Sequence, residues 1–286
     1  MNRRDALRQT ALLSATYFTA PFDPLSDSLR RGYPLGACDW SLQRACNPAV
    51  FAYAKKIGLD GVQLSYNSRA DESYLLRPES QQAMREASQN TGVKMASLAI
   101  GELNRVPLKS EARTVDWVSG SIDAAKALEV KVVLLAFFSQ GDLRNDDAGK
   151  KVVIERLKSL APKAEKQGIT LAIESYLSAQ EHLDIIEAVG SPNLKVYYDP
   201  RNAADAGHDP YAEIPLLGKQ KLICEVHLKE NGALLGQGSI DWPRIRQLLR
   251  QIRFKGWAHI EGAMPQGKTL DEAYPQNVQY ARKIIG

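Results

Sequence analysis

Four residues with metal-binding or proton-transferring side chains each directly follow a β-branched or aromatic residue: Glu174, Asp199, His227 and Glu261. Three carboxylates and one imidazole form a mixed oxygen and nitrogen ligand set. Such a set suits one divalent cation, with Mn²⁺ the first choice and Mg²⁺, Co²⁺ or Zn²⁺ as further options. Without a cation, three neighbouring carboxylates would repel one another and would be costly to bury. The pattern therefore predicts a metal site, provided the fold brings the four residues together.

The elements that must position these residues are short apolar runs that alternate with longer segments of helical period. Nearly continuous apolar runs, such as 132–137, are typical of parallel strands that are covered on both faces. Strand–helix alternation repeated eight times in this length predicts a single (β/α)8 TIM barrel, in which the carboxyl ends of the strands meet at one mouth. The predicted strands are 35–40, 61–65, 94–100, 131–137, 170–174, 195–199, 223–228 and 258–261.

Capping signals mark the ends of several predicted helices. Ser178 and Glu181 have the spacing of a capping box at a helix start. A glycine follows several helical runs, where a left-handed residue is expected to end the helix. The helices are predicted at 78–90, 110–128, 149–167, 178–189, 211–217, 242–253 and 269–285, with one more beginning at 47–48.

The composition supports a globular protein and argues against several other classes of protein. The chain is 44% hydrophobic and 24% charged, which is enough apolar material for a sizeable core. Its net charge is +4, but the basic residues are dispersed, so no nucleic-acid partner is expected. No apolar stretch is long enough to cross a bilayer, so no membrane partner is expected either. The sequence leaves a homo-oligomer open.

The three cysteines form neither a disulfide framework nor a zinc ribbon, because their number is odd and no CxxC motif occurs. Cys38 and Cys224 lie in apolar runs and are expected to pack as small hydrophobic residues.

The N-terminal segment 1–31 has the features of an export signal and a linker, so the barrel is predicted to span residues 32–286. Arg3 and Arg4 precede an apolar run from Thr10 to Ala20. The arginine pair, with Leu7, resembles a twin-arginine signal, which predicts export to the periplasm or beyond. The alternative is a frayed basic terminus on a cytoplasmic protein.

The chain resembles the sugar phosphate isomerase/epimerase family, the xylose isomerase-like TIM barrels that include tagatose 3-epimerase-type enzymes. The resemblance covers about residues 33–286 and is strongest from residue 170 onward. The motifs that carry it are Ile173-Glu-Ser-Tyr176, Tyr198-Asp-Pro-Arg-Asn-Ala203, Val226-His-Leu-Lys-Glu230, Leu235-Gly-Gln-Gly-Ser-Ile-Asp-Trp242 and Gly256-Trp-Ala-His-Ile-Glu261.

The resemblance implies a divalent metal held by Glu174, Asp199, His227 and Glu261, and a small carbohydrate substrate with a keto group. The metal would polarise the carbonyl and stabilise an enediolate. Glu174 and Glu261 would be the catalytic residues, one removing a proton and the other returning it. This chemistry gives epimerisation or aldose–ketose interconversion. The predicted substrate-binding residues are Lys229, Asn202, Arg201 and Trp40.

One departure from the family pattern leaves the reaction open. Epimerases of this family often carry a histidine where this chain has Asn202, and an amide cannot shuttle a proton. The main alternative is therefore a metal-dependent lyase or dehydratase acting on a 3-keto-glycoside or another oxidised sugar. A repair endonuclease of the same superfamily would need several more histidines near the site. A sugar-binding barrel without catalysis is disfavoured because all four ligand positions are kept.

Two further features have two interpretations each. The segment 236–238 could hold an anion with its backbone N–H groups, or it could be a tight turn before a helix capped by Asp241. His259, two residues before Glu261, could point to the same face and join the site.

Overall fold

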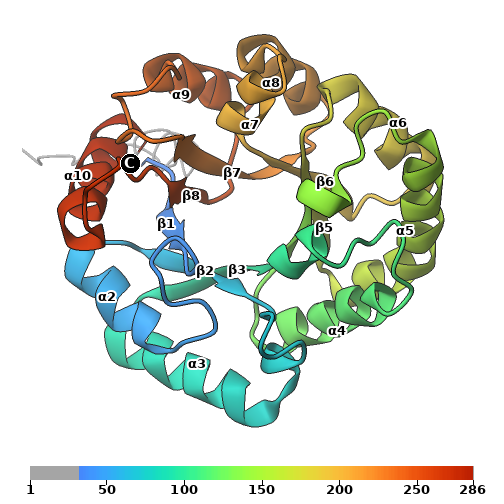
Figure 1. The fold of residues 1–286 in the computed structure, drawn as a ribbon, viewed down its shortest axis with the longest axis horizontal. Helices are drawn as coiled ribbons and strands as arrows, with labels where there is room; N and C mark the ends of the chain where they lie inside the picture. The colour runs from blue at the N-terminus through green and yellow to red at the C-terminus, as the bar shows by residue number, and fades with distance from the viewer. Residues whose placement is uncertain (1–31, 286) are drawn as a thin grey trace, which may run out of the picture. The chain divides into compact units, whose positions relative to one another are not determined.

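The computed structural model describes residues 32–285, and these contain a closed barrel of eight parallel strands in sequential order (Figure 1). The predicted (β/α)8 barrel is thus confirmed, whereas the predicted export signal lies outside the described residues. The strands are β1 (Leu35–Cys38), β2 (Gly61–Ser65), β3 (Lys94–Ile100), β4 (Val132–Phe137), β5 (Thr170–Ser175), β6 (Leu194–Tyr198), β7 (Ile223–Glu230) and β8 (Ala258–Gly262).

Helices surround the barrel and cover the outer faces of its strands (Figure 1). The α-helices are α2 (Ala49–Ile57), α3 (Pro78–Thr91), α4 (Thr114–Ala127), α5 (Asp147–Gln167), α6 (Ala179–Val189), α7 (Pro200–Asp205), α8 (Pro210–Lys219), α9 (Trp242–Gln251) and α10 (Leu270–Ile284). Short 3₁₀ turns follow three strands: η1 (Tyr74–Leu76), η2 (Gly101–Asn104) and η3 (Ser139–Gly141).

The apolar runs become strands because both of their faces are covered. All six residues of β4 are buried, as are all five of β2. In a parallel barrel one face of each strand meets the helices and the other fills the interior, so neither face can be polar without partners.

The capping predictions are confirmed. Ser178 and Glu181 form a capping box at the start of α6. Gly58, Gly92 and Gly168 end α2, α3 and α5 in the left-handed conformation, with φ of 82°, 74° and 66°. These ends are sharp because glycine has no Cβ to oppose a positive φ.

Two predicted strands end earlier than the sequence indicated. β1 ends at Cys38, so Trp40 lies in the following turn and not in the strand. β6 ends at Tyr198, and Asp199 caps the N-terminus of α7, a short helix that was not predicted.

The register of the sheet determines which side chains are neighbours at the mouth. His227 pairs with His259, and Lys229 pairs with Glu261, across β7 and β8. Side chains two residues apart on a strand share a face, so His227 and Lys229 point the same way, as predicted.

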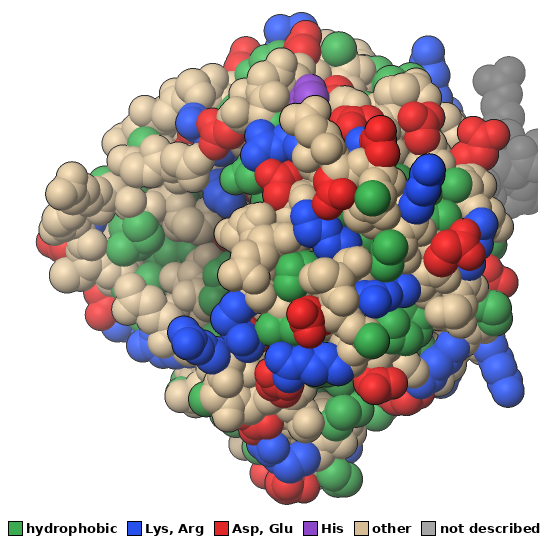
Figure 2. Space-filling view, turned by 45° about the vertical axis from the view of Figure 1, so that its right-hand side comes forward, with side chains coloured by type: hydrophobic (Ala, Val, Ile, Leu, Met, Phe, Trp, Pro, Cys, Tyr) green, Lys and Arg blue, Asp and Glu red, His purple; other side chains and the backbone are tan. Residues whose placement is uncertain are grey.

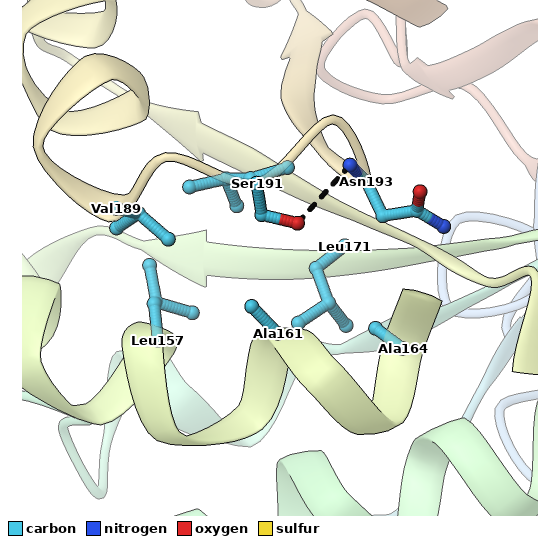
Figure 3. Close-up of a pocket in the computed structure, with 8 residues that line it drawn as sticks. Leu157, Ala161, Ala164, Leu171, Val189, Ser191 and Asn193 are labelled. Atoms are coloured by element: carbon cyan, nitrogen blue, oxygen red, sulfur yellow. Dashed lines mark hydrogen bonds between the residues drawn. The ribbon is translucent and has the colours of Figure 1, made fainter. Parts of the chain in front are cut away.

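The outer surface adds no second site of comparable chemistry among the described residues. Basic and acidic side chains are interspersed on the face shown in Figure 2. A small pocket lies beside the first half of β5, with Leu157, Ala161 and Leu171 in its lining (Figure 3). None of its lining residues is ionisable. None of the described helices has the length and apolarity needed to cross a membrane.

Candidate active site

The four predicted ligands converge at the carboxyl ends of β5 to β8. Glu174, Asp199, His227 and Glu261 each offer one ligand atom, and these atoms lie within 4.8 Å of one another. The first three residues are at most 4% exposed, and the side chain of Glu261 is 16% exposed. The sequence thus identified a group that the fold does assemble.

Asp199 provides the clearest sign that a cation fits here. Its Oδ1 accepts hydrogen bonds from the backbone N–H groups of Arg201 (2.7 Å) and Asn202 (3.1 Å). Its Oδ2 is buried and has no hydrogen-bond partner among the described residues. A buried carboxylate oxygen is rarely left in this state, because it loses its hydration without compensation. Burial also raises the pKa of Asp199 to about 7, with Glu174 and Glu261 adding to the rise.

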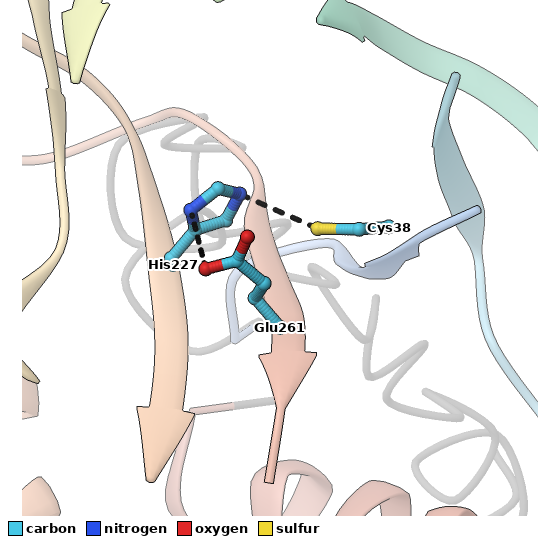
Figure 4. A group of neighbouring side chains, drawn as sticks. All are labelled: Cys38, His227 and Glu261. Atoms are coloured by element: carbon cyan, nitrogen blue, oxygen red, sulfur yellow. Dashed lines mark hydrogen bonds and ion pairs between the residues drawn. The ribbon is translucent and has the colours of Figure 1, made fainter. Parts of the chain in front are cut away.

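His227 has carboxylates on the side of one ring nitrogen and a thiol and an amide on the side of the other; Glu261 and Cys38 are shown in Figure 4. Its Nδ1 lies 2.9 Å from Glu174 Oε1 and 3.6 Å from Glu261 Oε2. Its Nε2 lies 2.9 Å from Gln63 Oε1 and 3.4 Å from Cys38 Sγ. The carboxylates therefore face Nδ1, and a cation shared with them would bind that nitrogen.

The pKa of His227 is raised well above its usual value. Burial alone would lower it, but the negative charge of Glu174 and Glu261 outweighs the effect of burial. A proton and a cation therefore compete for the same cluster of carboxylates.

Glu261 is held from two sides. Trp40 Nε1 donates to Oε1 at 3.0 Å, and Lys229 Nζ donates to Oε2 at 2.9 Å. Burial would raise the pKa of Glu261, but His227 and Lys229 outweigh it and lower the pKa to about 2. Lys229 also lies 3.9 Å from the unpartnered Oδ2 of Asp199. The carboxylates in turn raise the pKa of Lys229, so its ammonium remains charged.

Glu174 is held by a neutral donor. Asn202 Nδ2 donates to Glu174 Oε1 at 3.1 Å. Asn202 is 2% exposed and lies in α7, where the capping contact from Asp199 fixes its backbone. The sequence predicted Asn202 as a substrate contact, and the structure adds a hydrogen bond to one of the two predicted catalytic carboxylates.

The charges of the cluster match a divalent cation. Three carboxylates against the ammonium of Lys229 leave two negative charges uncompensated when His227 is neutral. Oxygen-rich sets with one imidazole suit Mn²⁺ and related ions. Cys38, His227 and Glu261 form an overlapping group, but the thiol lies on the Nε2 side of His227, away from Glu174.

Arg201 lies beside the site but is engaged by its neighbours. Its guanidinium forms an ion pair with Asp205 at 2.6 Å and donates to Ser239 Oγ at 2.8 Å. Its side chain is 20% exposed. A contact between Arg201 and a substrate therefore remains a prediction.

His259 does not join the ligand group. Its Nδ1 lies 2.7 Å from the hydroxyl of Tyr197 and 3.6 Å from Glu225 Oε2. Its Nε2 side lies against Gly36, where a Cβ would come within 2.8 Å of the ring nitrogen. Strand pairing places His259 level with His227, but its ring nitrogens face Tyr197 and Gly36, and it is not one of the four residues whose ligand atoms converge.

The segment after β7 is a turn that leads into α9, and N–H groups of the turn and of the helix start donate hydrogen bonds to two carboxylates of the protein. Asp241 caps α9 by accepting from Arg244 N. The buried carboxylate of Glu230 accepts from Ile240 N at 3.3 Å and from Trp242 Nε1 at 3.0 Å. A Cβ at Gly238 would come within 2.0 Å of Glu230 Oε2, so this position needs glycine to pass the carboxylate. The segment 236–238 lies in turns and bends before α9, and the backbone N–H of Gln237 donates to Leu234 O.

The sequence analysis missed a buried polar group beneath the ligands. Gln63, Ser97 and Cys38 are fully buried, and Glu225 is 2% exposed. Cys38 was expected to pack as a hydrophobic residue, but its thiol donates to Gln63 Oε1 at 3.2 Å and contacts His227. A polar residue inside an otherwise apolar strand, such as Gln63 in β2, was the available signal.

Comparisons with known proteins agree with this fold. Residues 51–284 match the xylose isomerase-like TIM barrel family. The chain is 27% identical over 177 residues to 2-epi-5-epi-valiolone 7-phosphate 2-epimerase from Actinoplanes sp., covering 62% of this chain and 65% of that protein. It is 24% identical over 253 residues to L-ribulose-5-phosphate 3-epimerase UlaE from Escherichia coli K12, covering 82% of this chain and 88% of that protein.

Solved structures share the fold. The crystal structure of the 3-keto-D-glucoside 4-epimerase YcjR from E. coli superposes with a TM-score of 0.73 and 14% identity, covering 88% of this chain and 99% of that one. The matched segment spans slightly less than two thirds of the Actinoplanes protein. The family match covers most of the chain, and the chain therefore belongs to the xylose isomerase-like TIM barrel family.

Proposed function

We propose that this protein is a divalent-metal-dependent isomerase or epimerase that acts on a keto sugar or a keto-sugar derivative. The observation that carries the proposal is the convergence of Glu174, Asp199, His227 and Glu261, with an unpartnered Asp199 oxygen among them. When bound, the cation would supply Lewis-acid polarisation of the substrate carbonyl. Relatives named as epimerases of sugar phosphates and of a keto-glucoside support a carbohydrate substrate.

The two glutamates would have the proton-transfer roles. They flank Nδ1 of His227 at 2.9 Å for Glu174 and 3.6 Å for Glu261, so they approach one centre from β5 and β8. Asn202 would orient the Glu174 carboxylate, and Trp40 and Lys229 would orient Glu261. A carboxylate with fixed direction transfers a proton more effectively than a mobile one, because less orientation must be gained in the transition state.

A second candidate is a lyase or dehydratase that uses the same carboxylates on a 3-keto-glycoside. The unequal surroundings of Glu174 and Glu261 favour it. Glu261 is tied to the cation Lys229, whereas Glu174 contacts the neutral amide of Asn202. A single base on one side and a cation on the other would suit elimination, in which the base removes a proton from carbon and the cation stabilises the departing oxygen, which then takes a proton from water.

A substrate screen tests the proposal and separates the two reactions. Purified protein is stripped with a chelator, reloaded with Mn²⁺, and incubated with keto sugars and keto-glycosides in D₂O. Incorporation of deuterium into the substrate or into an isomer of it, with no loss of heavy atoms and seen only after reloading, supports an isomerase or epimerase. Loss of water or of an aglycone indicates the lyase. Equal activity in stripped and reloaded protein contradicts metal dependence.

A further inference from the structure

A chain of buried hydrogen bonds runs beneath the metal-ligand cluster and returns to it. It runs from Ser97 in β3 through Gln63 in β2 to His227 in β7, and the carboxyl group of Glu225 in β7 lies near Ser97. All four residues are at most 2% exposed. Polar groups this deep in a barrel are costly unless each has a partner, so their directions are tightly defined.

The direction of each bond follows from the donors available. Gln63 Nε2 donates to Ser97 Oγ at 3.2 Å. The amide oxygen Oε1 of Gln63 therefore points the other way. There it accepts from Cys38 Sγ at 3.2 Å and lies 2.9 Å from His227 Nε2.

An amide oxygen can only accept, so the nitrogen that faces it must carry the proton. In neutral His227 the proton is then on Nε2, and the lone pair is on Nδ1. Nδ1 is the nitrogen that faces Glu174 and Glu261. A histidine that ligates a metal usually has its other N–H directed to an acceptor in this way.

We infer that Gln63 is a positioning residue for the metal site, which holds His227 in the Nε2–H tautomer and thereby presents Nδ1 to the cation. Ser97 fixes the orientation of the Gln63 amide by accepting from its Nε2. The inference rests on the proposed metal-dependent function, and it assigns a role to buried polar residues that touch neither substrate nor cation.

The test measures Mn²⁺ affinity by titration calorimetry on the full chain, without substrate. Gln63→Leu removes the acceptor at similar size and should weaken Mn²⁺ binding about 10- to 100-fold, the usual effect of losing such a partner. Gln63→Glu keeps an acceptor oxygen and should bind Mn²⁺ within about threefold of wild type, as expected for another acceptor in that place.

A matched control separates loss of the acceptor from general loosening of the fold. Asn277 is also a fully buried amide, but it bonds Leu235 N and Ala263 O and contacts none of the proposed ligands. Asn277→Leu should lower thermal stability at least as much as Gln63→Leu while leaving Mn²⁺ affinity close to wild type.

The outcomes are distinct. Wild-type affinity in Gln63→Leu, or an equal loss in Gln63→Leu and Gln63→Glu, overturns the positioning role while the metal site stands. Absence of Mn²⁺ binding to the wild type overturns both the proposed function and this inference. In Zn²⁺-loaded protein, ¹⁵N spectra of His227 should show the proton on Nε2, and a proton on Nδ1 also overturns the role of Gln63.

Discussion

The side-chain amide of Asn202 donates a hydrogen bond to Glu174 over 3.1 Å, and it does so from the six-residue helix α7, whose N-cap is the carboxylate of Asp199. Two members of the proposed metal site are thus linked through one short helix. The amide fixes the orientation of the Glu174 carboxylate, but it cannot act as an acid or a base toward it.

Removal of this amide should therefore impair catalysis more than folding. Asn202→Ala is expected to lower kcat/KM roughly 10- to 100-fold, because a hydrogen bond to a charged group contributes about 1.5–3 kcal/mol. The backbone N–H of Asn202 still caps against Asp199, so α7 should persist. Steady-state kinetics and thermal unfolding measure the two effects. A variant with full activity would show that Glu174 needs no such orientation.

Lys229 is expected to have opposite effects on metal binding and on turnover. Its ammonium lies 2.9 Å from Glu261 and 3.9 Å from Asp199, so it opposes a cation placed among them. Lys229→Met should bind Mn²⁺ roughly 3- to 10-fold more tightly, since a nearby positive charge is removed. Turnover should fall, because Glu261 loses its donor.

Lys163→Met is a suitable control, since Lys163 forms an ion pair with Asp123 at 2.6 Å on the helical surface. It should change neither quantity. Weaker Mn²⁺ binding in Lys229→Met would contradict the assignment of its charge to the metal cluster.

Metal affinity should rise with pH. The pKa of His227 is raised well above its usual value, and that of Asp199 is raised to about 7. Both groups hold protons in the metal-free protein near neutrality and must release them when the cation binds. Affinity is therefore lowest below pH 7 and increases as these protons are lost.

Calorimetry in two buffers with different ionisation enthalpies measures the protons released upon Mn²⁺ binding. At least one proton per cation is expected at pH 6, and fewer as the pH rises. No proton release across this range would mean that these groups do not ligate the metal.

We propose that residues 1–31 direct export through a twin-arginine pathway, on the basis of Arg3 and Arg4 before an apolar run. Changing both arginines to lysine should retain the protein in the cytoplasm, as measured by fractionation of the cells that express it. Equal export of this variant, or retention of the wild type, would exclude a twin-arginine signal.

The sequence could predict the barrel and the four proposed ligands because both follow from local pattern. Glu174 and Glu261 stand out as charged residues after apolar strands, and alternation of strands with helices places strand ends together. Lys229 could be placed on the face of His227 by the same period of two.

The remaining contacts could not be predicted, because they depend on which distant strands face each other across the barrel. Gln63 meets His227 only after the barrel closes, and Asn202 reaches Glu174 only through the helix α7. The Asp199–Pro200 pair was a helix-start signal that could have revealed α7. Trp40 was predicted to lie in the first strand, which ends two residues before it. Its indole N–H nevertheless donates a hydrogen bond to Glu261.

The most direct test of the account is the activity of Mn²⁺-loaded Glu174→Gln and Glu261→Gln. Glutamine keeps the shape and one coordinating oxygen but cannot take a proton, so metal content should remain measurable. Turnover of the keto sugar identified in the screen should fall by about 10²–10⁴ in each variant, the usual contribution of a positioned acid or base. If each variant retains its Mn²⁺ and turns over the sugar at a near-normal rate, these carboxylates do not carry the chemistry and the account is wrong.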